Sequence, residues 1–578
     1  MSDHELDPVL SLRGVSVRYD SGDDWIGAGL NLDVPAGQTV VLLGPSGCGK
    51  STLLLAMAGL IPTSVEADLR GSVVCAGVDT AQAEPGQLAS HTGVVFQDPD
   101  AQIVTDTLLD EVCFGLENLL VPVDEIEDRA LAARRSAGRG RSRADALRSP
   151  AALSGGERQR LAIACALALE PKLIILDEPT ANLDPTASAG FYADLAVLRD
   201  RERTIILVEH ELDDVLPFTD RVVALDRSCV VIADGAPAEV FGTRSQDLRE
   251  HGIWLPTATE IALRLGHEGT VDRLPVTLQA LADHLIAADA LETAPLPASE
   301  PCADGSGGTA ESDVVVSARE ATVKLGPRTV LRDIDLDVDA GEFLAVAGTN
   351  GAGKSTLTRA LAGLTPLSAG KVELDGARID TLDARQIGDR IGYVFQNPEH
   401  QFVTRTVRDE LAFGLRIRGQ GDHETAVAVD SMLERFDLAR YARVNPFLLS
   451  YGEKRRLSVA TALITEPEVL ILDEPTFGQD RTRAQEMTGL MGELNAAGTT
   501  LIVVTHDLQL VADSAHRVAV LADGHLLATG PTSQILDDGA LLERAGLRAP
   551  PLHRFARLVG SPVWQRRSRF DQIPGAAG

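Results

Sequence analysis

Two stretches of the chain contain glycine-rich loops that end in lysine and serine. The pattern Gly-x-x-x-x-Gly-Lys-Ser occurs at 44–51 and again at 348–355, each time after a short apolar run. In such a loop the glycines let successive backbone N–H groups point at phosphate oxygens from a helix N-terminus. The lysine neutralises the β- and γ-phosphates, and the serine is a ligand for Mg²⁺. We therefore expect two sites for a nucleoside triphosphate, formed by Gly44, Pro45, Ser46, Gly47, Cys48, Gly49, Lys50, Ser51 and Thr52, and by Gly348, Thr349, Asn350, Gly351, Ala352, Gly353, Lys354, Ser355 and Thr356.

Acidic pairs complete each expected site. The apolar runs LIILDEP and VLILDEP lead into Asp177 and Asp473, which we expect to hold Mg²⁺ through water. The residues that follow, Glu178 and Glu474, are expected to polarise the attacking water as general bases. A lone Asp-Glu pair after a strand is usually a solvated turn. Its repetition downstream of both phosphate loops favours a catalytic role.

The two loops belong to an internal repeat. VVLLGPSGCGKSTLL (40–54) reappears as LAVAGTNGAGKSTLT (344–358), and LSGGERQRLAIACAL (153–167) as LSYGEKRRLSVATAL (449–463). A period of about 300 residues indicates two homologous domains and not a solenoid. Short β-branched runs followed by segments of helical periodicity predict an α/β fold with parallel strands in each domain. We expect a first domain over 8–288, a Pro/Gly/Ser-rich linker over 289–312, a second domain over 313–562 and a tail over 563–578.

Composition narrows the class of protein. The chain has 578 residues and a formal net charge of −31, which repels phosphate backbones and argues against a nucleic-acid partner. The six cysteines show no C-x-x-C spacing, so neither a zinc site nor a disulfide framework is expected. No apolar run approaches the roughly 18 residues that span a bilayer, and the first residues are acidic where a signal peptide is basic. We therefore expect a chain that neither spans a membrane nor is exported.

The motifs FQDP, LSGGE, LDEPTANLD and EH, taken together, resemble the nucleotide-binding domain of ATP-binding cassette (ABC) proteins over nearly the whole chain. The resemblance implies two tandem P-loop NTPase domains of the ABC ATPase type, each with a helical subdomain and a small C-terminal extension. It implies ATP and Mg²⁺ as cofactors. It also implies that Gln97 and Gln396 sense the metal, that His210 and His506 contact the γ-phosphate, and that Tyr19 stacks on adenine.

The same resemblance implies composite sites, in which a signature segment of one domain closes over the γ-phosphate bound by the other. The implied signature residues are Ser154, Gly155 and Gly156, and Ser450 and Gly452, and the implied D-loop aspartates are Asp184 and Asp480. Each composite site departs from the family pattern once. Tyr451 replaces a signature glycine, and Leu325 stands where the first domain has Tyr19. We expect both sites to hydrolyse ATP, with weaker ATP binding at the Lys354 site.

A finer resemblance concerns FQDPDAQIVTDTLLDEVCFGLENL, its second copy and AGLRAPPLHRFARLVG, with GIWLPTATEIALRLG more loosely. These segments resemble the ATPase subunits of energy-coupling factor importers. The resemblance implies a location at the cytoplasmic face of the cell membrane, under a transmembrane coupling protein and a small substrate-binding membrane protein. The imported vitamin, vitamin precursor or Co²⁺/Ni²⁺ would not touch this chain. Two acidic pairs are either helix-start acids that complement the dipole or acceptors for an arginine of the membrane partner: Asp110 and Glu111, and Asp409 and Glu410.

Two other classes of protein also contain twin cassettes. A soluble twin-cassette ATPase that acts on ribosomes is expected to carry long charged interdomain helices or basic surfaces. This chain instead has a short Pro/Gly/Ser linker and a strongly negative net charge. The fused ATPase of a sugar importer accounts for two cassettes, but not for the DEVCFG and AGLRAPPL segments. A neighbouring gene for a coupling-type membrane protein would distinguish the importer from the soluble protein.

Overall fold

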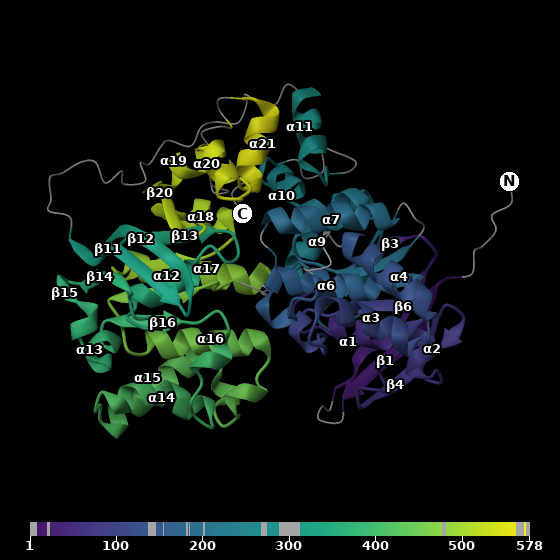
Figure 1. The fold of residues 1–578 in the computed structure, drawn as a ribbon, viewed down its shortest axis with the longest axis horizontal. Helices are drawn as coiled ribbons and strands as arrows, with labels where there is room; N and C mark the ends of the chain where they lie inside the picture. The colour runs from purple at the N-terminus through teal and green to yellow at the C-terminus, as the bar shows by residue number, and fades with distance from the viewer. Residues whose placement is uncertain are drawn as a thin grey trace. The chain divides into compact units, whose positions relative to one another are not determined.

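A computed structural model describes residues 8–19, 24–136, 146–153, 155–180, 183, 185–199, 203–266, 274–287, 313–476, 481–561, 564 and 572–573. The chain divides into two compact units, with the boundary between Leu291 and Glu292. Figure 1 colours the first unit from purple to teal and the second from teal-green to yellow. Within the described residues, none of the helices combines the length and the apolar composition that crossing a bilayer requires.

The first unit contains a mainly parallel sheet and an antiparallel sheet. The parallel sheet has the order β10-β9-β3-β8-β7-β6 in the described part of the chain, with only β10 antiparallel to its neighbour. The antiparallel sheet has the order β2-β1-β4-β5. The bounds are β1 (Leu10–Tyr19), β2 (Ile26–Val34), β3 (Thr39–Leu43), β4 (Ala67–Cys75), β5 (Val78–Asp79), β6 (Thr92–Val95), β7 (Leu173–Asp177), β8 (Thr204–Val208), β9 (Arg221–Leu225) and β10 (Val231–Gly235).

Helices surround these sheets in the first unit. Helix α1 follows β3 and packs in a core that joins the two sheets, whereas α3, α4 and α6 pack on one another as a helical subdomain. The bounds are α1 (Lys50–Met57), α2 (Pro85–Ala89), α3 (Leu108–Asn118), α4 (Val123–Ser136), α6 (Gly155–Ala168), α7 (Pro185–Arg199), α8 (Leu212–Val215), α9 (Pro237–Glu250), α10 (Thr257–Arg264) and α11 (Leu278–Ala287), with 3-10 turns η1 (Pro99–Ala101), η2 (Pro150–Ala152) and η3 (Leu216–Phe218).

The second unit repeats this architecture. Its parallel sheet has the order β16-β17-β18-β13-β19-β20, with only β20 antiparallel, and its antiparallel sheet has the order β12-β11-β14-β15. The strand bounds are β11 (Val314–Leu325), β12 (Arg328–Asp339), β13 (Phe343–Gly348), β14 (Ala369–Leu374), β15 (Ala377–Arg378), β16 (Ile391–Val394), β17 (Val469–Asp473), β18 (Thr500–Val504), β19 (Arg517–Ala522) and β20 (His525–Pro531).

Two groups of helices can be distinguished in the second unit, apart from the helices that accompany its sheets (Figure 1). Helices α14, α15 and α16 lie together as a helical subdomain, and α19 to α21 follow the sheet as a C-terminal extension. The bounds are α12 (Lys354–Leu361), α13 (Ala384–Gly388), α14 (Val407–Ile417), α15 (Asp422–Arg435), α16 (Tyr451–Leu463), α17 (Arg481–Ala496), α18 (Leu508–Ser514), α19 (Thr532–Asp537), α20 (Gly539–Arg544) and α21 (Pro551–Val559), with 3-10 turns η4 (Ile379–Thr381), η5 (Pro398–Gln401), η6 (Ala439–Tyr441) and η7 (Pro446–Leu448).

The strand order explains how distant motifs meet. Strands β3, β8 and β7 are neighbours in the first unit, as β13, β18 and β17 are in the second, and every residue of these strands is buried. A parallel strand covered on both faces is apolar throughout, which is why the sequence shows continuous runs instead of alternation. Because parallel strands end at the same edge, the phosphate loop, the acidic pair and the histidine come together there. The predicted α/β fold is confirmed.

Candidate functional site

The phosphate loop of the first unit joins β3 to α1. At its end Gly49 has a φ of +107°, in the left-handed region, and a Cβ there would lie 2.1 Å from Cγ2 of Ile26. Only glycine fits this position without strain. The Lys50 ammonium is buried and donates to the carbonyl oxygens of Gly44 at 2.7 Å and Pro45 at 3.1 Å. These contacts hold the lysine along the loop whose backbone amides would receive the phosphates.

The second unit has the same loop geometry. Gly353 has a φ of +105°, and its Cβ would lie 2.7 Å from Cδ2 of Leu331. The Lys354 ammonium donates to the carbonyl oxygens of Gly348 at 2.7 Å and Thr349 at 3.1 Å. Both loops are therefore shaped in the same way at the start of their helices.

Asp177 and Asp473 are the last residues of β7 and β17. Burial raises the pKa of Asp177 to about 6, although the hydrogen bond with the Ser51 hydroxyl opposes this shift. Burial also raises the pKa of Asp473, against the effect of the Ser355 hydroxyl beside it. Oδ1 of Asp177 and both carboxylate oxygens of Asp473 have no hydrogen-bond partner among the residues that the structure describes.

Unpartnered buried carboxylate oxygens are costly unless a cation or a donor reaches them. Here they lie beside the hydroxyl groups of Ser51 and Ser355, and carboxylate and hydroxyl oxygens are hard ligands that suit Mg²⁺. The residues at both sites therefore fit this ion. Gln97, the third predicted metal ligand of the first site, reaches the next residue of the acidic pair, as described below.

The glutamate of each acidic pair contacts the histidine that follows the neighbouring strand. Glu178 Oε1 lies 3.0 Å from Nε2 of His210, and the Gln97 amide donates to Glu178 Oε2 at 2.8 Å. Glu474 Oε2 lies 2.9 Å from Nδ1 of His506. In the first unit three separate motifs thus meet at the Glu178 carboxylate. In the second unit two motifs meet at the Glu474 carboxylate.

The histidines also set the ionisation of these glutamates. Burial by itself would raise the pKa of Glu178 and Glu474, but the hydrogen bond and the charge of His210 and His506 outweigh it, with a smaller contribution from the loop lysine. The net pKa of both carboxyl groups is lowered. An ionised carboxylate beside the phosphate loop is able to accept a proton from water.

The backbone at both glutamates is unusual. Glu178 has a φ of +44° and Glu474 a φ of +51°, in the left-handed region that costs a residue with a side chain about 1–2 kcal/mol. Their amides donate to the carbonyl oxygens of Val208 at 3.1 Å and Val504 at 2.9 Å. The turn after the strand is thus hydrogen-bonded to the neighbouring strand, two residues before the histidine in both units. Strain held at a functional group is typical of active sites.

The two units differ at the predicted adenine position. Tyr19 ends β1, and its hydroxyl lies 3.2 Å from Oγ1 of Thr52 in the first turn of α1. Leu325 ends β11 and is 54% exposed. The first unit therefore offers an aromatic ring beside its phosphate helix, and the second offers an aliphatic side chain.

The signature segments begin helices. Gly155 and Gly156 start α6, whereas Ser154, Asp184 and Asp480 lie outside the described residues. In the second unit Ser450 caps α16, and its amide donates to Oε2 of Glu453 at 2.9 Å. Tyr451 is the first residue of this helix, and a Cβ on Gly452 would meet no atom within 4 Å. The helix start of the variant signature is thus retained.

The two predicted acidic pairs separate into buried and exposed members. Glu111 is 5% exposed and accepts from the backbone amides of Val104 at 3.0 Å and Thr105 at 2.7 Å. Asp110 is exposed and exchanges hydrogen bonds with Thr107, the N-cap of α3. The glutamate therefore organises the loop before α3, and the aspartate remains at the surface.

The second unit divides its pair in the same way. Glu410 is 5% exposed and accepts from the amides of Val403 and Thr404, and from the Thr404 hydroxyl at 2.7 Å. Asp409 remains half-exposed, bonded to the cap of α14 and 3.3 Å from Arg416. The sequence did not distinguish the two acids. A signal was present, because in both repeats a Val-Thr pair precedes the glutamate by six and seven residues.

The model of the ABC transporter family matches residues 28–181 and 331–477, one copy in each unit. The chain belongs to the ABC transporter family. Each unit is an ABC ATP-binding domain, so the chain has two of them in tandem, and such domains bind ATP, generally use Mg²⁺ and couple its hydrolysis to transport.

Relatives of this ABC protein match it over nearly its whole length. It is 36% identical to the "Putative HMP/thiamine import ATP-binding protein YkoD" of Bacillus subtilis, over 95% of this chain and 96% of that protein. It is 34% identical to a "Putative ABC transporter ATP-binding protein" of Methanosarcina acetivorans, over 95% of this chain and 90% of that one. The structure of CbiO1 from Clostridium perfringens, part of the ABC transporter complex cbiONQ, is 30% identical and covers 43% of this chain and 100% of its own, with a TM-score of 0.37.

Proposed function

We propose that this chain is the ATP-hydrolysing subunit of a membrane importer of the energy-coupling factor type. The observation that carries the ATPase part is the repetition of a complete catalytic arrangement. In both units a buried loop lysine, a buried strand-end aspartate and a glutamate paired with histidine lie at one edge of the sheet. A single degenerate copy would be compatible with a regulatory domain. Two intact copies favour hydrolysis in both halves.

In this proposal the chain's own residues carry the proton transfer. Glu178 and Glu474, with their lowered pKa, would accept the proton that the attacking water loses as its oxygen bonds to the γ-phosphorus. The bond from the γ-phosphorus to the β–γ bridging oxygen would break in the same step, so that ADP leaves with that oxygen and phosphate is released. His210 and His506 would hold these carboxylates in place from the adjacent strand end. Lys50 and Lys354 would neutralise charge on the phosphate oxygens of their own halves.

Mg²⁺ would supply charge neutralisation at the β- and γ-phosphates. Its proposed ligands are Ser51, Gln97 and Asp177 in the first half, and Ser355, Gln396 and Asp473 in the second. The family resemblance further suggests that Ser154, Gly155 and Gly156 complete the site of the second half, and that Ser450 and Gly452 complete the site of the first.

A repeated apolar surface supports a membrane partner. Val104 and Phe114 of the first unit are 65% and 48% exposed, and Val403 and Phe413, at the same repeat positions, are 64% and 43% exposed. In each unit the phenylalanine lies on the helix that begins beside the exposed member of the acidic pair. Exposed apolar side chains that recur at matching positions of the two repeats favour a binding surface over a chance distribution. An acid at its edge would suit an arginine of the partner.

The type of importer is inferred from sequence. The relative in Bacillus subtilis is named for HMP/thiamine import, which favours a vitamin or vitamin precursor over Co²⁺ or Ni²⁺ as the substrate. The segments after the Q-loop and at the C-terminus resemble energy-coupling factor ATPases. We therefore propose a transmembrane coupling protein and a small substrate-binding membrane protein as partners, at the cytoplasmic face of the membrane.

Hydrolysis is tested with the purified full chain. Lys50→Ala combined with Lys354→Ala removes both loop ammonium groups, and we expect Mg²⁺-dependent ATP hydrolysis to be lost while the thermal midpoint stays within a few degrees. Lys172→Ala changes an exposed lysine outside the loops and is the matched control. Undiminished hydrolysis in the double variant would refute the assignment.

The membrane part has its own test. Phe114→Ser with Phe413→Ser should abolish co-purification with the coupling protein and leave basal hydrolysis unchanged. Val427→Ser, at a residue of α15 that is 58% exposed, is the control. Retained co-purification would leave the ATPase assignment intact but contradict the docking surface. Sedimentation of the chain with ribosomes would favour the soluble twin-cassette alternative.

A further inference from the structure

A buried carboxyl group that the proposed reaction does not use lies directly before His210. Glu209 follows β8, is 4% exposed, and accepts a hydrogen bond from the Tyr192 hydroxyl at 2.5 Å. The Thr180 hydroxyl donates to the same oxygen, Oε1, and lies 3.2 Å from the Tyr192 hydroxyl. Three side chains from the ends of β7 and β8 and from the middle of α7 thus meet at one buried point.

This cluster forms a second connection between the two chain segments that carry Glu178 and His210. Thr180 is two residues after Glu178, and Glu209 is one residue before His210. The two chain segments that meet at the Glu178–His210 contact are therefore joined a second time by the Thr180–Glu209 hydrogen bond. Tyr192 extends the connection to α7. A shift of Glu209 would move the backbone that carries His210, and so would change how that ring meets Glu178.

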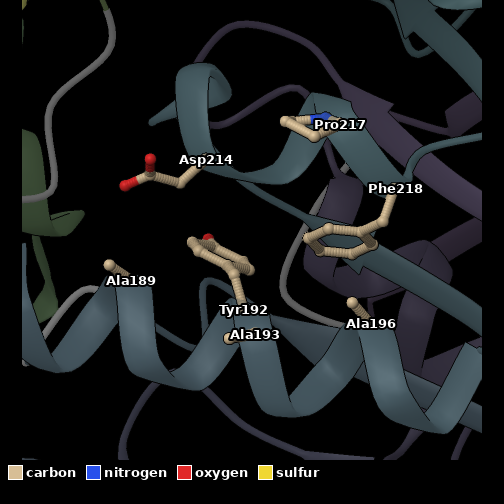
Figure 2. A pocket seen from close by; sticks show the side chains of 7 residues that line it. All are labelled: Ala189, Tyr192, Ala193, Ala196, Asp214, Pro217 and Phe218. Carbon is tan, nitrogen blue, oxygen red and sulfur yellow. The ribbon is translucent and has the colours of Figure 1, made fainter.

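Tyr192 is held by ring contacts as well as by the bonds of its hydroxyl. Its ring lies against Phe191 at 5.3 Å and Phe218 at 5.7 Å between centroids. Another side of it opens into a pocket between α7 and the segment of α8 and η3, as Figure 2 shows. The other lining residues are Ala189, Ala193 and Ala196 of α7, and Asp214, Pro217 and Phe218 opposite them. Tyr192 is nevertheless only 3% exposed, and its hydroxyl is the group that reaches Glu209 and Thr180.

The second unit uses these positions differently. Thr505 and Thr488 stand where the first unit has Glu209 and Tyr192. The Thr505 hydroxyl accepts from the amide of Asp507 at 3.0 Å, and the Thr488 hydroxyl donates to the carbonyl oxygen of Ala484 at 2.9 Å. Each threonine bonds within its own segment. The histidine also meets its glutamate through Nδ1 there and through Nε2 in the first unit.

We propose that Glu209, held by Tyr192 and Thr180, is a positioning residue that fixes His210 against Glu178 in the first half only. The proposal rests on the proposed ATPase function of these two residues. Burial, more than the nearby Glu211 and Glu178, makes Glu209 a neutral acid near pH 7, since its pKa is raised to about 8. A neutral acid can donate a hydrogen bond as well as accept one, as glutamine does, so Glu209→Gln preserves the cluster whereas Glu209→Ala removes it.

The experiment measures kcat and KM for ATP in the full chain, in the wild-type background and with Glu474→Gln, which disables the second base. We expect Glu209→Ala and Tyr192→Phe to lower kcat at least two-fold in the wild-type background and at least five-fold with Glu474→Gln, with KM for ATP within two-fold. Glu209→Gln should stay within two-fold in kcat. If Glu474→Gln abolishes turnover by itself, the two sites depend on each other. The proposal is then tested by the expected two-fold loss of kcat in the wild-type background.

Matched controls separate positioning from simple destabilisation. Thr505→Ala and Thr488→Ala change the corresponding residues of the second half and should leave kcat unchanged. Unchanged kcat in Glu209→Ala, or an equal loss in Glu209→Gln, would overturn the proposal. If Lys50→Ala with Lys354→Ala abolishes hydrolysis while Glu209→Ala does not affect it, only this inference fails. If that lysine variant hydrolyses normally, the proposed function fails first.

Discussion

Replacing Glu111 with alanine removes a buried acceptor that holds two backbone amides. The amides of Val104 and Thr105 donate to it at 3.0 and 2.7 Å. A hydrogen bond to a charged group contributes about 1.5–3 kcal/mol, so two of them sum to about 3–6 kcal/mol. Val104 is 65% exposed and its amide can bond to water after the change, so we expect a loss near the lower limit, about 3 kcal/mol. For a unit of this size that lowers the thermal midpoint by about 6–12 °C.

Differential scanning calorimetry of the full chain measures this loss on the transition of the first unit. Asp110→Ala, which changes an exposed cap contact, should cost less than about 1 kcal/mol. Glu410→Ala should lower the transition of the second unit by a similar amount to Glu111→Ala, because Glu410 also holds two amides. A shift below about 2 °C for Glu111→Ala, or one equal to that of Asp110→Ala, would refute the reasoning. Coupling to a membrane partner is therefore better tested at the two aspartates.

Three further outcomes are expected. Gly49→Ala places a Cβ 2.1 Å from Ile26 Cγ2 at a φ of +107° and should abolish ATP binding at the first site, whereas Gly47→Ala, in open space, should cost only about 1–2 kcal/mol in urea unfolding. The raised pKa of Glu209 means that the folded chain keeps a proton that the unfolded chain releases, so stability should fall as pH rises from about 5 to 8, and Glu209→Gln should flatten that slope in urea titrations. Tyr19→Ala should weaken ATP binding at the first site by about 1–3 kcal/mol, measured by calorimetry with Lys354→Ala present; an affinity equal to that of the unchanged ring would contradict stacking.

Motif spacing predicted the residues that lie at strand ends. Glu178 was placed by the apolar run before it and by its spacing from the phosphate loop, whereas His210 was named by the family resemblance. Their direct contact at 3.0 Å also depends on β7 and β8 being neighbours, which follows from the sheet order and not from the motifs themselves.

Contacts within the packed interior could not be predicted in this way. Tyr192 and Glu209 are separated by the rest of α7, by residues 200–203 and by β8, and nothing in the two local sequences indicates that they meet. Glu111 was read as one of two equivalent surface acids. Only the path of the preceding loop shows that its carboxylate points inward and Asp110 outward. Side-chain direction at a helix start depends on the path of the incoming chain, and the repeated Val-Thr pair before each glutamate indicates that path only once the contacts are known.

The left-handed backbone at Glu178 and Glu474 bears on how this protein would respond to directed evolution. At a positive φ, glycine and asparagine are less strained than glutamate, so either replacement relieves about 1 kcal/mol of backbone strain. The same replacement removes the proposed base and its hydrogen bond to the histidine, so the net change in stability depends on which of these two effects is larger. Libraries selected for heat resistance therefore need a growth or transport requirement alongside the thermal one, because the thermal requirement does not by itself retain glutamate at positions 178 and 474.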